Sequence, residues 1–157
     1  FLIECFHELI KKNNQIKLII IGEGELKNTL KQKIDELNVG NNIFLLGYKE
    51  NIYRYLRYSK AFVLSSLWED PGFVLIEAAF CNLNLISSNC PNGPSELLNN
   101  GKDGFIYKSN NKEDFLMKFN DYQLSDDHNL FNKKLAVKKN IKNFTYFKHS
   151  EVLKSIL

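Results

Sequence analysis

The sequence predicts an α/β protein with a doubly wound parallel sheet and flanking helices. Short apolar runs alternate with stretches of helical periodicity along the 157 residues, which is the order that strands joined by crossover helices produce. Several of the apolar runs are followed by turns that contain glycine, a residue that commonly marks the end of a strand. The chain length suits one domain with a hydrophobic core rather than two.

Each expected strand is a short apolar run bounded by turn residues. The run at 16–21 is apolar enough to be buried on both faces, and Gly22 ends it. Further strands are expected, in chain order, at 42–46, 61–65, 84–88 and 103–107. Because helical stretches connect these runs, neighbouring strands are expected to be parallel.

The expected helices place apolar residues three and four positions apart. The first is expected at 1–10, with no capping residue ahead of it, from which we expect that the chain is a fragment. Further helices are expected at 25–37, 52–58, 73–81, 95–98, 112–122, 127–142 and 146–157. Ser95 is the expected cap of its short helix, and the pair Asp126-Asp127 is expected to begin another.

The composition is that of an ordinary globular protein, with 44% hydrophobic and 25% charged residues. The net charge of +3 is too small to indicate nucleic-acid binding by itself. No apolar run approaches the roughly 20 residues that a membrane span needs, and no signal-peptide pattern is present. The three cysteines show no CxxC spacing, which predicts reduced thiols in a cytoplasmic protein.

The stretch from Leu67 to Ala79 is the most informative part of the sequence. It follows an expected strand, and Pro71 and Gly72 break the chain before a helix that begins at Phe73. The free N–H groups and the positive dipole end of such a helix form an anion site. Two acids frame this turn, Glu69 and Glu77, and a carboxylate can accept hydrogen bonds from both hydroxyls of a ribose.

Other motifs are less specific. Gly22-Glu23-Gly24 lacks the third glycine of a dinucleotide fingerprint, so we interpret it as a tight turn. The loop at 92–96 follows an expected strand and is either a ligand loop or an ordinary connection. The histidines are scattered, and neither a metal-ligand spacing nor a GxSxG nucleophile motif occurs.

Residues 69–77 resemble the E-x7-E motif of retaining glycosyltransferases of family 4, which have the two-domain GT-B architecture. Further segments resemble the same family in order and spacing, namely residues 19–27, 43–48, 65–69, 93–96 and 100–106. The similarity runs from Leu2 to about Leu116. Several ordered motifs make this resemblance more specific than the acid pair alone.

The resemblance implies that residues 1–157 form the Rossmann-like carboxy-terminal domain, which binds a nucleotide-sugar donor. Glu69 then matches the catalytic-site acid that contacts hydroxyls of the donor sugar near the reacting carbon. Glu77 matches the acid that holds the ribose hydroxyls. The other implied donor-binding residues are Gly72, Phe73 and Val74 at the diphosphate, and Gly47, Tyr48 and Lys49 beside the base.

The resemblance also implies that the site contains no metal, no cofactor and no established nucleophilic residue. Members of the family need no divalent metal or other cofactor, and they transfer with retention without an established enzyme nucleophile. The usual Glu-Gly-Phe-Gly reads Glu69-Asp70-Pro71-Gly72 here, which keeps the turn glycine. The first strand of the domain, which carries the basic residues that neutralise the diphosphate, and the amino-terminal acceptor domain would both precede Phe1.

The family's strand order, 3-2-1-4-5-6, has its first strand at the centre. If that strand lies outside the chain, the strands at 16–21 and 61–65 should not pair directly with each other.

The sequence therefore predicts the donor-binding half of a retaining glycosyltransferase that uses a nucleoside-diphosphate sugar, with UDP as the expected nucleotide. The expected acceptor is a surface saccharide or a lipid-linked sugar, bound through the amino-terminal domain. The expected location is cytoplasmic, and peripheral association of the complete protein with the inner face of the membrane stays open. Two alternatives also stay open: a nucleotide-sugar epimerase of the same architecture, and a non-catalytic Rossmann-like binding domain.

Overall fold

The computed structural model describes residues 1–70, 72–144 and 146–156. The chain divides into two compact units, residues 1–54 and 55–157, and each is described by itself. Pro71, which the sequence places in the turn before the 73–81 helix, lies outside the described residues. Leu157, the expected last residue of the final helix, lies outside them as well.

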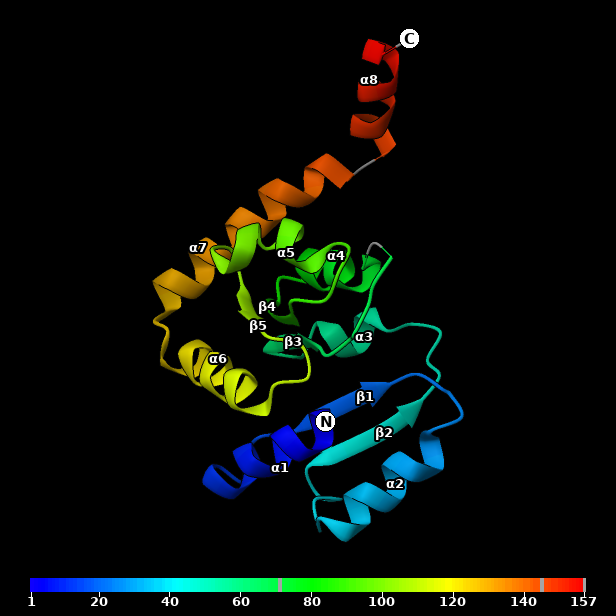
Figure 1. The fold of residues 1–157 in the computed structure, drawn as a ribbon, viewed down its shortest axis with the longest axis vertical. Helices are drawn as coiled ribbons and strands as arrows, with labels where there is room; N and C mark the ends of the chain where they lie inside the picture. The colour runs from blue at the N-terminus through cyan, green and yellow to red at the C-terminus, as the bar shows by residue number, and fades with distance from the viewer. Residues whose placement is uncertain (71, 145, 157) are drawn as a thin grey trace. The chain divides into compact units, whose positions relative to one another are not determined.

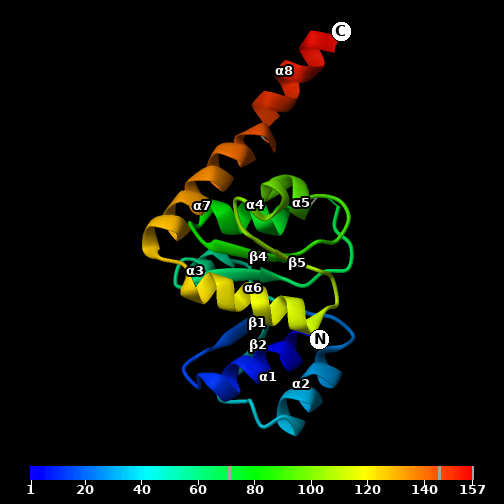
Figure 2. The same cartoon turned by 60° about the vertical axis from the view of Figure 1, so that its left-hand side comes forward.

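The first unit is built on a parallel pair of strands, with two helices packed beside each other (Figures 1 and 2). Strand β1 (Leu18–Ile21) pairs with β2 (Ile43–Gly47), and the register shifts between Ile20 and Ile21. The helices are α1 (Leu2–Lys12) and α2 (Lys27–Glu36). This is the strand, helix, strand order that a parallel crossover requires.

Helix α1 supplies much of the core of the first unit. Ile3, Phe6 and Leu9 are buried, and their spacing of three places them along one face of the helix. An ion pair of 2.8 Å joins α1 to α2, between Glu4 and Lys33. The hydrogen bond and the charge of Glu4 raise the pKa of Lys33.

The second unit contains a parallel sheet in the order β3 (Ala61–Leu64), β4 (Asn84–Ser88), β5 (Phe105–Tyr107). The helices after β2 are α3 (Tyr53–Leu56), α4 (Phe73–Phe80), α5 (Pro94–Leu97), α6 (Lys112–Leu124), α7 (Asp127–Asn140) and α8 (Tyr146–Ile156). Figures 1 and 2 show α4 and α7 on one side of this sheet and α6 on the other. A central strand covered on both faces should be buried throughout, and all five residues of β4 are.

An aromatic cluster packs α6 against β5. The rings of Tyr107 and Phe115 meet edge to face at 5.0 Å between centroids, and both side chains are fully buried. Tyr122 extends the cluster through edge contacts with Phe105 at 5.8 Å and Phe119 at 5.7 Å. Burial raises the pKa of the Tyr122 phenol, because it disfavours the charged form.

The order of the strands within each of the two sheets confirms the predicted order. The expected order becomes β2-β1 for one part and β3-β4-β5 for the other, and these are the two parallel sheets that the structure contains. Among the described residues β1 pairs with β2 and β3 pairs with β4.

Element boundaries differ from the prediction in a few places. The cap expected at Ser95 is wrong, because α5 already begins at Pro94 with Gly93 in the capping position, so Ser95 lies inside the helix. The expected start of a helix at the acid pair is confirmed, since the Asp126 carboxylate accepts a 2.7 Å hydrogen bond from the N–H of Asn129. Strand β5 begins at Phe105 rather than at Asp103.

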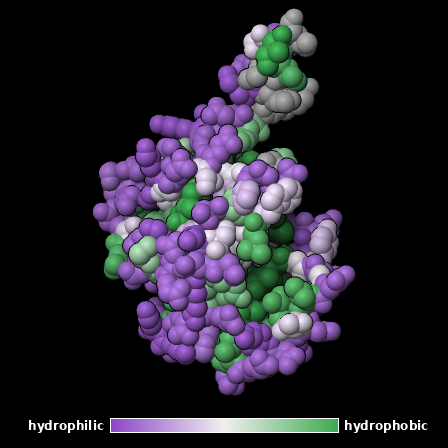
Figure 3. Space-filling view, viewed as in Figure 1, coloured by the Kyte–Doolittle hydropathy of each residue, from purple (hydrophilic) through white to green (hydrophobic). Residues whose placement is uncertain are grey.

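The surface over α6 and α7 is mainly hydrophilic, with isolated apolar side chains (Figure 3). Within the described residues, no helix has both the length and the apolar composition of a membrane span. Cys5 and Cys90 are buried and Cys81 is partly exposed, and none of these three described cysteines forms a disulfide bond.

Candidate functional site

The turn between β3 and α4 depends on the backbone conformation of Gly72. This glycine occupies the capping position of α4 with φ of 81° and ψ of 45°, in the left-handed region that side chains with a Cβ disfavour. Its carbonyl accepts a hydrogen bond from the N–H of Leu75 at 3.0 Å. A Cβ at Gly72 would lie 3.8 Å from Oε2 of Glu69, so the turn packs against that carboxylate.

Glu69 is held on both its side chain and its backbone. The hydroxyl of Ser66 donates a 2.5 Å hydrogen bond to Oε1 of Glu69, and the Glu69 N–H donates to the carbonyl of Pro91 at 3.3 Å. The Glu69 side chain is half-buried. A carboxylate beside the positive end of α4 is also stabilised by the helix dipole.

The first turn of α4 is the place where the sequence predicts an anion site. The N–H groups of Phe73 and Val74 lie in that turn, where backbone donors have no acceptor within the helix. Both side chains are exposed, so solvent reaches this end of the helix. Glu77 is half-buried and lies four residues after Phe73, which places both on the same helical face one turn apart.

The predicted site residues thus fall into two groups. The structure brings Glu69 next to Gly72 at the start of α4, with Phe73, Val74 and Glu77 following on that helix. Gly47, Tyr48 and Lys49 belong to the other unit, at the end of β2.

At the end of β2, Gly47 is buried and adopts φ of 68°. Its carbonyl accepts a 3.0 Å hydrogen bond from the N–H of Gly22, which joins the carboxyl ends of β1 and β2. Tyr48 is 70% exposed and Lys49 is half-buried. The Tyr48 ring is therefore available to a flat ligand.

A hollow of about 240 Å³ lies beside Gly47, and sequence reasoning missed it. It is lined by Ile20, Gly22, Glu23, Gly24, Leu26, Lys27, Leu30, Leu45 and Gly47. Glu23 and Lys27 form an ion pair of 3.5 Å, and most of the other lining is apolar. The available signal was the i, i+4 spacing of Glu23 and Lys27 after a strand, which we interpreted only as a tight turn.

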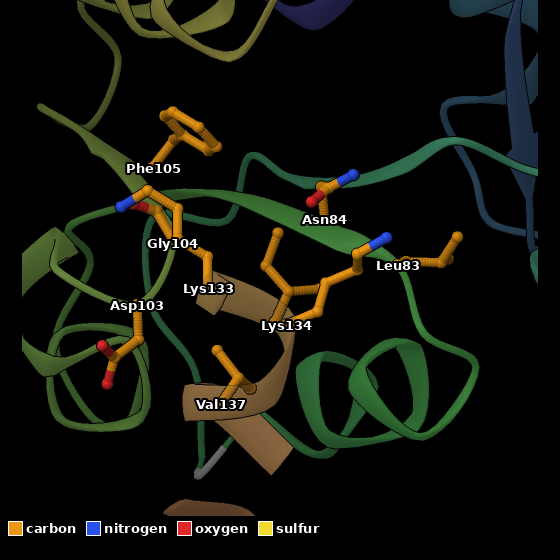
Figure 4. Close-up of a pocket in the computed structure, with 9 residues that line it drawn as sticks. Leu83, Asn84, Asp103, Gly104, Phe105, Lys133, Lys134 and Val137 are labelled. Carbon is orange, nitrogen blue, oxygen red and sulfur yellow. The ribbon is translucent and has the colours of Figure 1, made fainter. Parts of the chain in front are cut away.

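The amino edge of the β3-β4-β5 sheet lies away from the start of α4 and is filled by side chains of the protein itself (Figure 4). There a narrow space is lined by the first residues of β4 and β5 and by α7. The Lys133 ammonium donates to the carbonyl of Lys102 at 2.6 Å, with longer bonds to Gly101 and Gly104. Burial lowers the pKa of Lys133, and the charge of Asp103 opposes this. This edge is structural, whereas ligands of open α/β sheets bind at the carboxyl edge.

The described residues contain no group of three or more His, Cys, Asp or Glu side chains placed to hold a metal ion. The start of α4 offers backbone N–H donors and carboxylate acceptors. Backbone N–H donors suit phosphate oxygens, and carboxylate acceptors suit sugar hydroxyls.

Comparison with known proteins gives the family. Residues 1–144 match the family described as Glycosyl transferases group 1. A glycosyltransferase of Methanocaldococcus jannaschii is 47% identical over 98 residues, which cover 62% of this chain and 24% of the relative. An Escherichia coli relative, named UDP-Gal:alpha-D-GlcNAc-diphosphoundecaprenol alpha-1,3-galactosyltransferase, is 37% identical over 68% of this chain and 28% of its own length.

A solved structure agrees with this match. A variant of Staphylococcus aureus TarM, in complex with fondaparinux, alpha-GlcNAc-glycerol and UDP, superposes with a TM-score of 0.81 and 26% identity. The superposition covers 99% of this chain and 31% of that one. The chain thus spans about a quarter to a third of the length of these proteins.

The family match covers both groups of site residues, and the fold agrees with it over nearly the whole chain. The chain belongs to the group 1 glycosyl transferases, and its fold is that of the Rossmann-like carboxy-terminal domain of a GT-B enzyme.

Proposed function

We propose that the complete protein transfers a sugar, with retention of configuration, from a UDP-sugar to a saccharide or lipid-linked acceptor. Residues 1–157 form the donor-binding domain, and the acceptor binds to an amino-terminal domain outside the chain. The observation that carries this proposal is the Glu69 carboxylate, held against the capping glycine of α4. The product is a surface polysaccharide or another glycoconjugate, which fits the GlcNAc-diphosphoundecaprenol acceptor in the name of the E. coli relative.

At this site the donor diphosphate binds to the backbone N–H groups of Gly72, Phe73 and Val74. The partial positive charge at the start of a helix favours an anion there. Glu69 accepts a hydrogen bond from a hydroxyl of the donor sugar, since one of its oxygens faces the turn. Glu77, one turn along α4, accepts hydrogen bonds from the ribose hydroxyls.

The base binds at the end of β2, beside Gly47, Tyr48 and Lys49. The buried glycine permits close approach of a flat ring to the backbone, and the exposed Tyr48 offers a face for stacking. Uracil is proposed because the TarM complex contains UDP and the name of the E. coli relative specifies UDP-Gal. The hollow beside Gly47 provides apolar surface next to this position.

The reaction uses no divalent metal and no further cofactor. The charge of the leaving UDP is instead stabilised by the α4 N-terminus and by basic residues from outside the chain. Glu69 acts by contact with the donor sugar and forms no covalent bond to it. The protein works in the cytoplasm, where lipid-linked acceptors draw it to the inner face of the membrane.

Calorimetry and an activity assay on the complete protein test this assignment. UDP should bind more tightly than GDP or ADP, without added metal. Glu77→Gln should weaken UDP binding on the order of tenfold, because a neutral amide with one acceptor oxygen replaces the charged acceptor of the two ribose hydroxyls. Glu69→Gln should leave UDP affinity within about twofold and reduce the release of UDP from its sugar nucleotide on the order of a hundredfold.

Glu113→Gln is the matched control, because Glu113 lies in the first turn of α6 and outside the proposed site. It should change neither UDP binding nor turnover. If Glu69→Gln and Glu77→Gln both behave like this control, the site assignment is wrong. Release of free epimerised sugar nucleotide without an acceptor would instead support the epimerase.

A further inference from the structure

We infer that Ser66 is a positioning residue for Glu69, and that the ends of β4 and β5 hold Ser66 in place through Ser88 and Tyr107. This inference rests on the proposed function of Glu69. It adds to that function a set of hydroxyl groups that fix the carboxylate before a donor binds.

The contact between Ser66 and Glu69 is short and involves a charged acceptor. The hydroxyl lies 2.5 Å from Oε1, a separation typical of an O–H group bonded to an ionised carboxylate. Oε1 is thereby occupied, while Oε2 is the oxygen that lies nearest to Gly72. The bond therefore orients the carboxylate and leaves one oxygen directed at the turn where the donor is proposed to bind.

The backbone that carries Ser66 is itself tied to the neighbouring strands. The Ser88 hydroxyl donates to the carbonyl of Ser66 at 2.6 Å, and the Tyr107 hydroxyl donates to the carbonyl of Leu64 at 2.9 Å. Ser88 and Tyr107 are each 1% exposed. Buried hydroxyl groups that donate at such distances are costly to displace, because their hydrogen bonds cannot be replaced by water.

These side chains come from the carboxyl ends of two adjacent strands. Ser88 is the last residue of β4 and Tyr107 is the last residue of β5, and both reach the segment that leaves β3. The Glu69 N–H adds a bond to Pro91 in the loop after β4. Hydrogen bonds thus hold the segment 64–69 at Leu64, at Ser66 and at Glu69. A carboxylate that must contact one particular sugar hydroxyl needs such a rigid support.

A positioning role and a purely structural role of Ser66 predict different measurements. If the hydroxyl orients Glu69, its loss should affect the step that involves the sugar and spare the binding of UDP, which has no sugar at that position. If it only stabilises the loop, its loss should also disturb the start of α4 and weaken UDP binding.

The experiment compares Ser66→Ala and Ser66→Thr in the complete protein. Ser66→Ala should lower the rate of UDP release from the sugar nucleotide on the order of tenfold, while calorimetry shows UDP affinity within about twofold of wild type. Ser66→Thr keeps a hydroxyl and should recover most of the rate. Ser59→Ala is the matched control, because Ser59 is also half-buried and makes one 3.0 Å hydroxyl bond, and it should change neither value.

A double variant completes the test. In the Glu69→Gln background, Ser66→Ala should cause little further loss, because the two residues act on the same step. The inference is overturned if Ser66→Ala weakens UDP binding as much as it lowers the rate, if its effect is unchanged in that background, or if the variant does not fold. If Glu69→Gln itself leaves the rate unaltered, the proposed function has failed instead.

Discussion

At the residue scale, asparagine and glycine make the turns of this chain possible. Positive φ angles occur at Asn38, Asn82, Asn92, Asn99, Asn100 and Asn110, and also at Gly22, Gly47, Gly72, Gly93 and Gly101. Asparagine tolerates the left-handed region better than other residues with a Cβ. Gly72 differs from the asparagines because its turn also packs against Glu69 and begins the helix of the proposed anion site.

Replacing Gly72 tests the backbone conformation directly. A Cβ there would have neighbours no closer than 3.7 Å, so the cost of Gly72→Ala is backbone strain of about 1 kcal/mol rather than a clash. Gly72→Ala should lower the unfolding free energy by about that amount and weaken UDP binding. Gly72→Asn should have a smaller effect on both quantities, because asparagine tolerates the left-handed region better. Gly40→Ala is the control, because the only atom close to its Cβ is at 3.9 Å. Equal behaviour of all three variants would contradict the role of the left-handed turn.

The residue scale also shows where sequence reasoning was sufficient. Gly72 was predicted as a turn residue from one short segment, and it occupies the capping position of α4. The roles of Glu69 and Glu77, read from the same segment, stay predictions. The bonds from β4 to Ser66 and from β5 to Leu64 were not predictable, because their donors lie 22 and 43 positions further along the chain and meet this segment only in the folded sheet. The Ser95 cap was wrong because Pro94 is itself well suited to the first position of a helix.

At the element scale, α7 determines where β5 begins. The expected strand at 103–107 is shorter, since the carbonyls of Gly101, Lys102 and Gly104 bind the Lys133 ammonium. That ammonium also lies 5.1 Å from the ring centroid of Phe105. A lysine some thirty residues later in the chain gives no local signal, so the boundary could not be derived from the segment alone.

Removing this lysine should loosen the loop that precedes β5. Lys133→Met keeps the apolar stem but leaves carbonyl groups without their donor, which costs about 1–3 kcal/mol of unfolding free energy. Lys134→Met is the matched control, because Lys134 is the adjacent half-buried lysine of α7. Chemical denaturation of the complete protein measures both variants. UDP binding should stay unchanged in each, because Lys133 lies at the amino edge of the sheet. Similar stability of both variants would show that the Lys133 bonds contribute little.

At the scale of the whole molecule, the topology was the most predictable feature. Apolar runs with crossover helices gave a parallel sheet, and the resemblance gave its order on each side of the first strand. The placement of Glu69 follows from this order, because the carboxyl ends of parallel strands lie at one edge. The sequence does not show what lies against the other edges of β1 and β3.

We propose that a strand from outside the 157 residues pairs with both of those edges in the complete protein. Parallel sheets rarely leave interior strands unpaired, because the open N–H and C=O groups would attract other chains. A crystal structure of the complete protein with UDP should show this strand hydrogen-bonded to β1 on one side and to β3 on the other. Basic residues that follow it should approach the diphosphate at the start of α4. Direct pairing of β1 with β3 in that structure would contradict the expected strand order, and with it the proposed source of the positive charge that the leaving diphosphate requires.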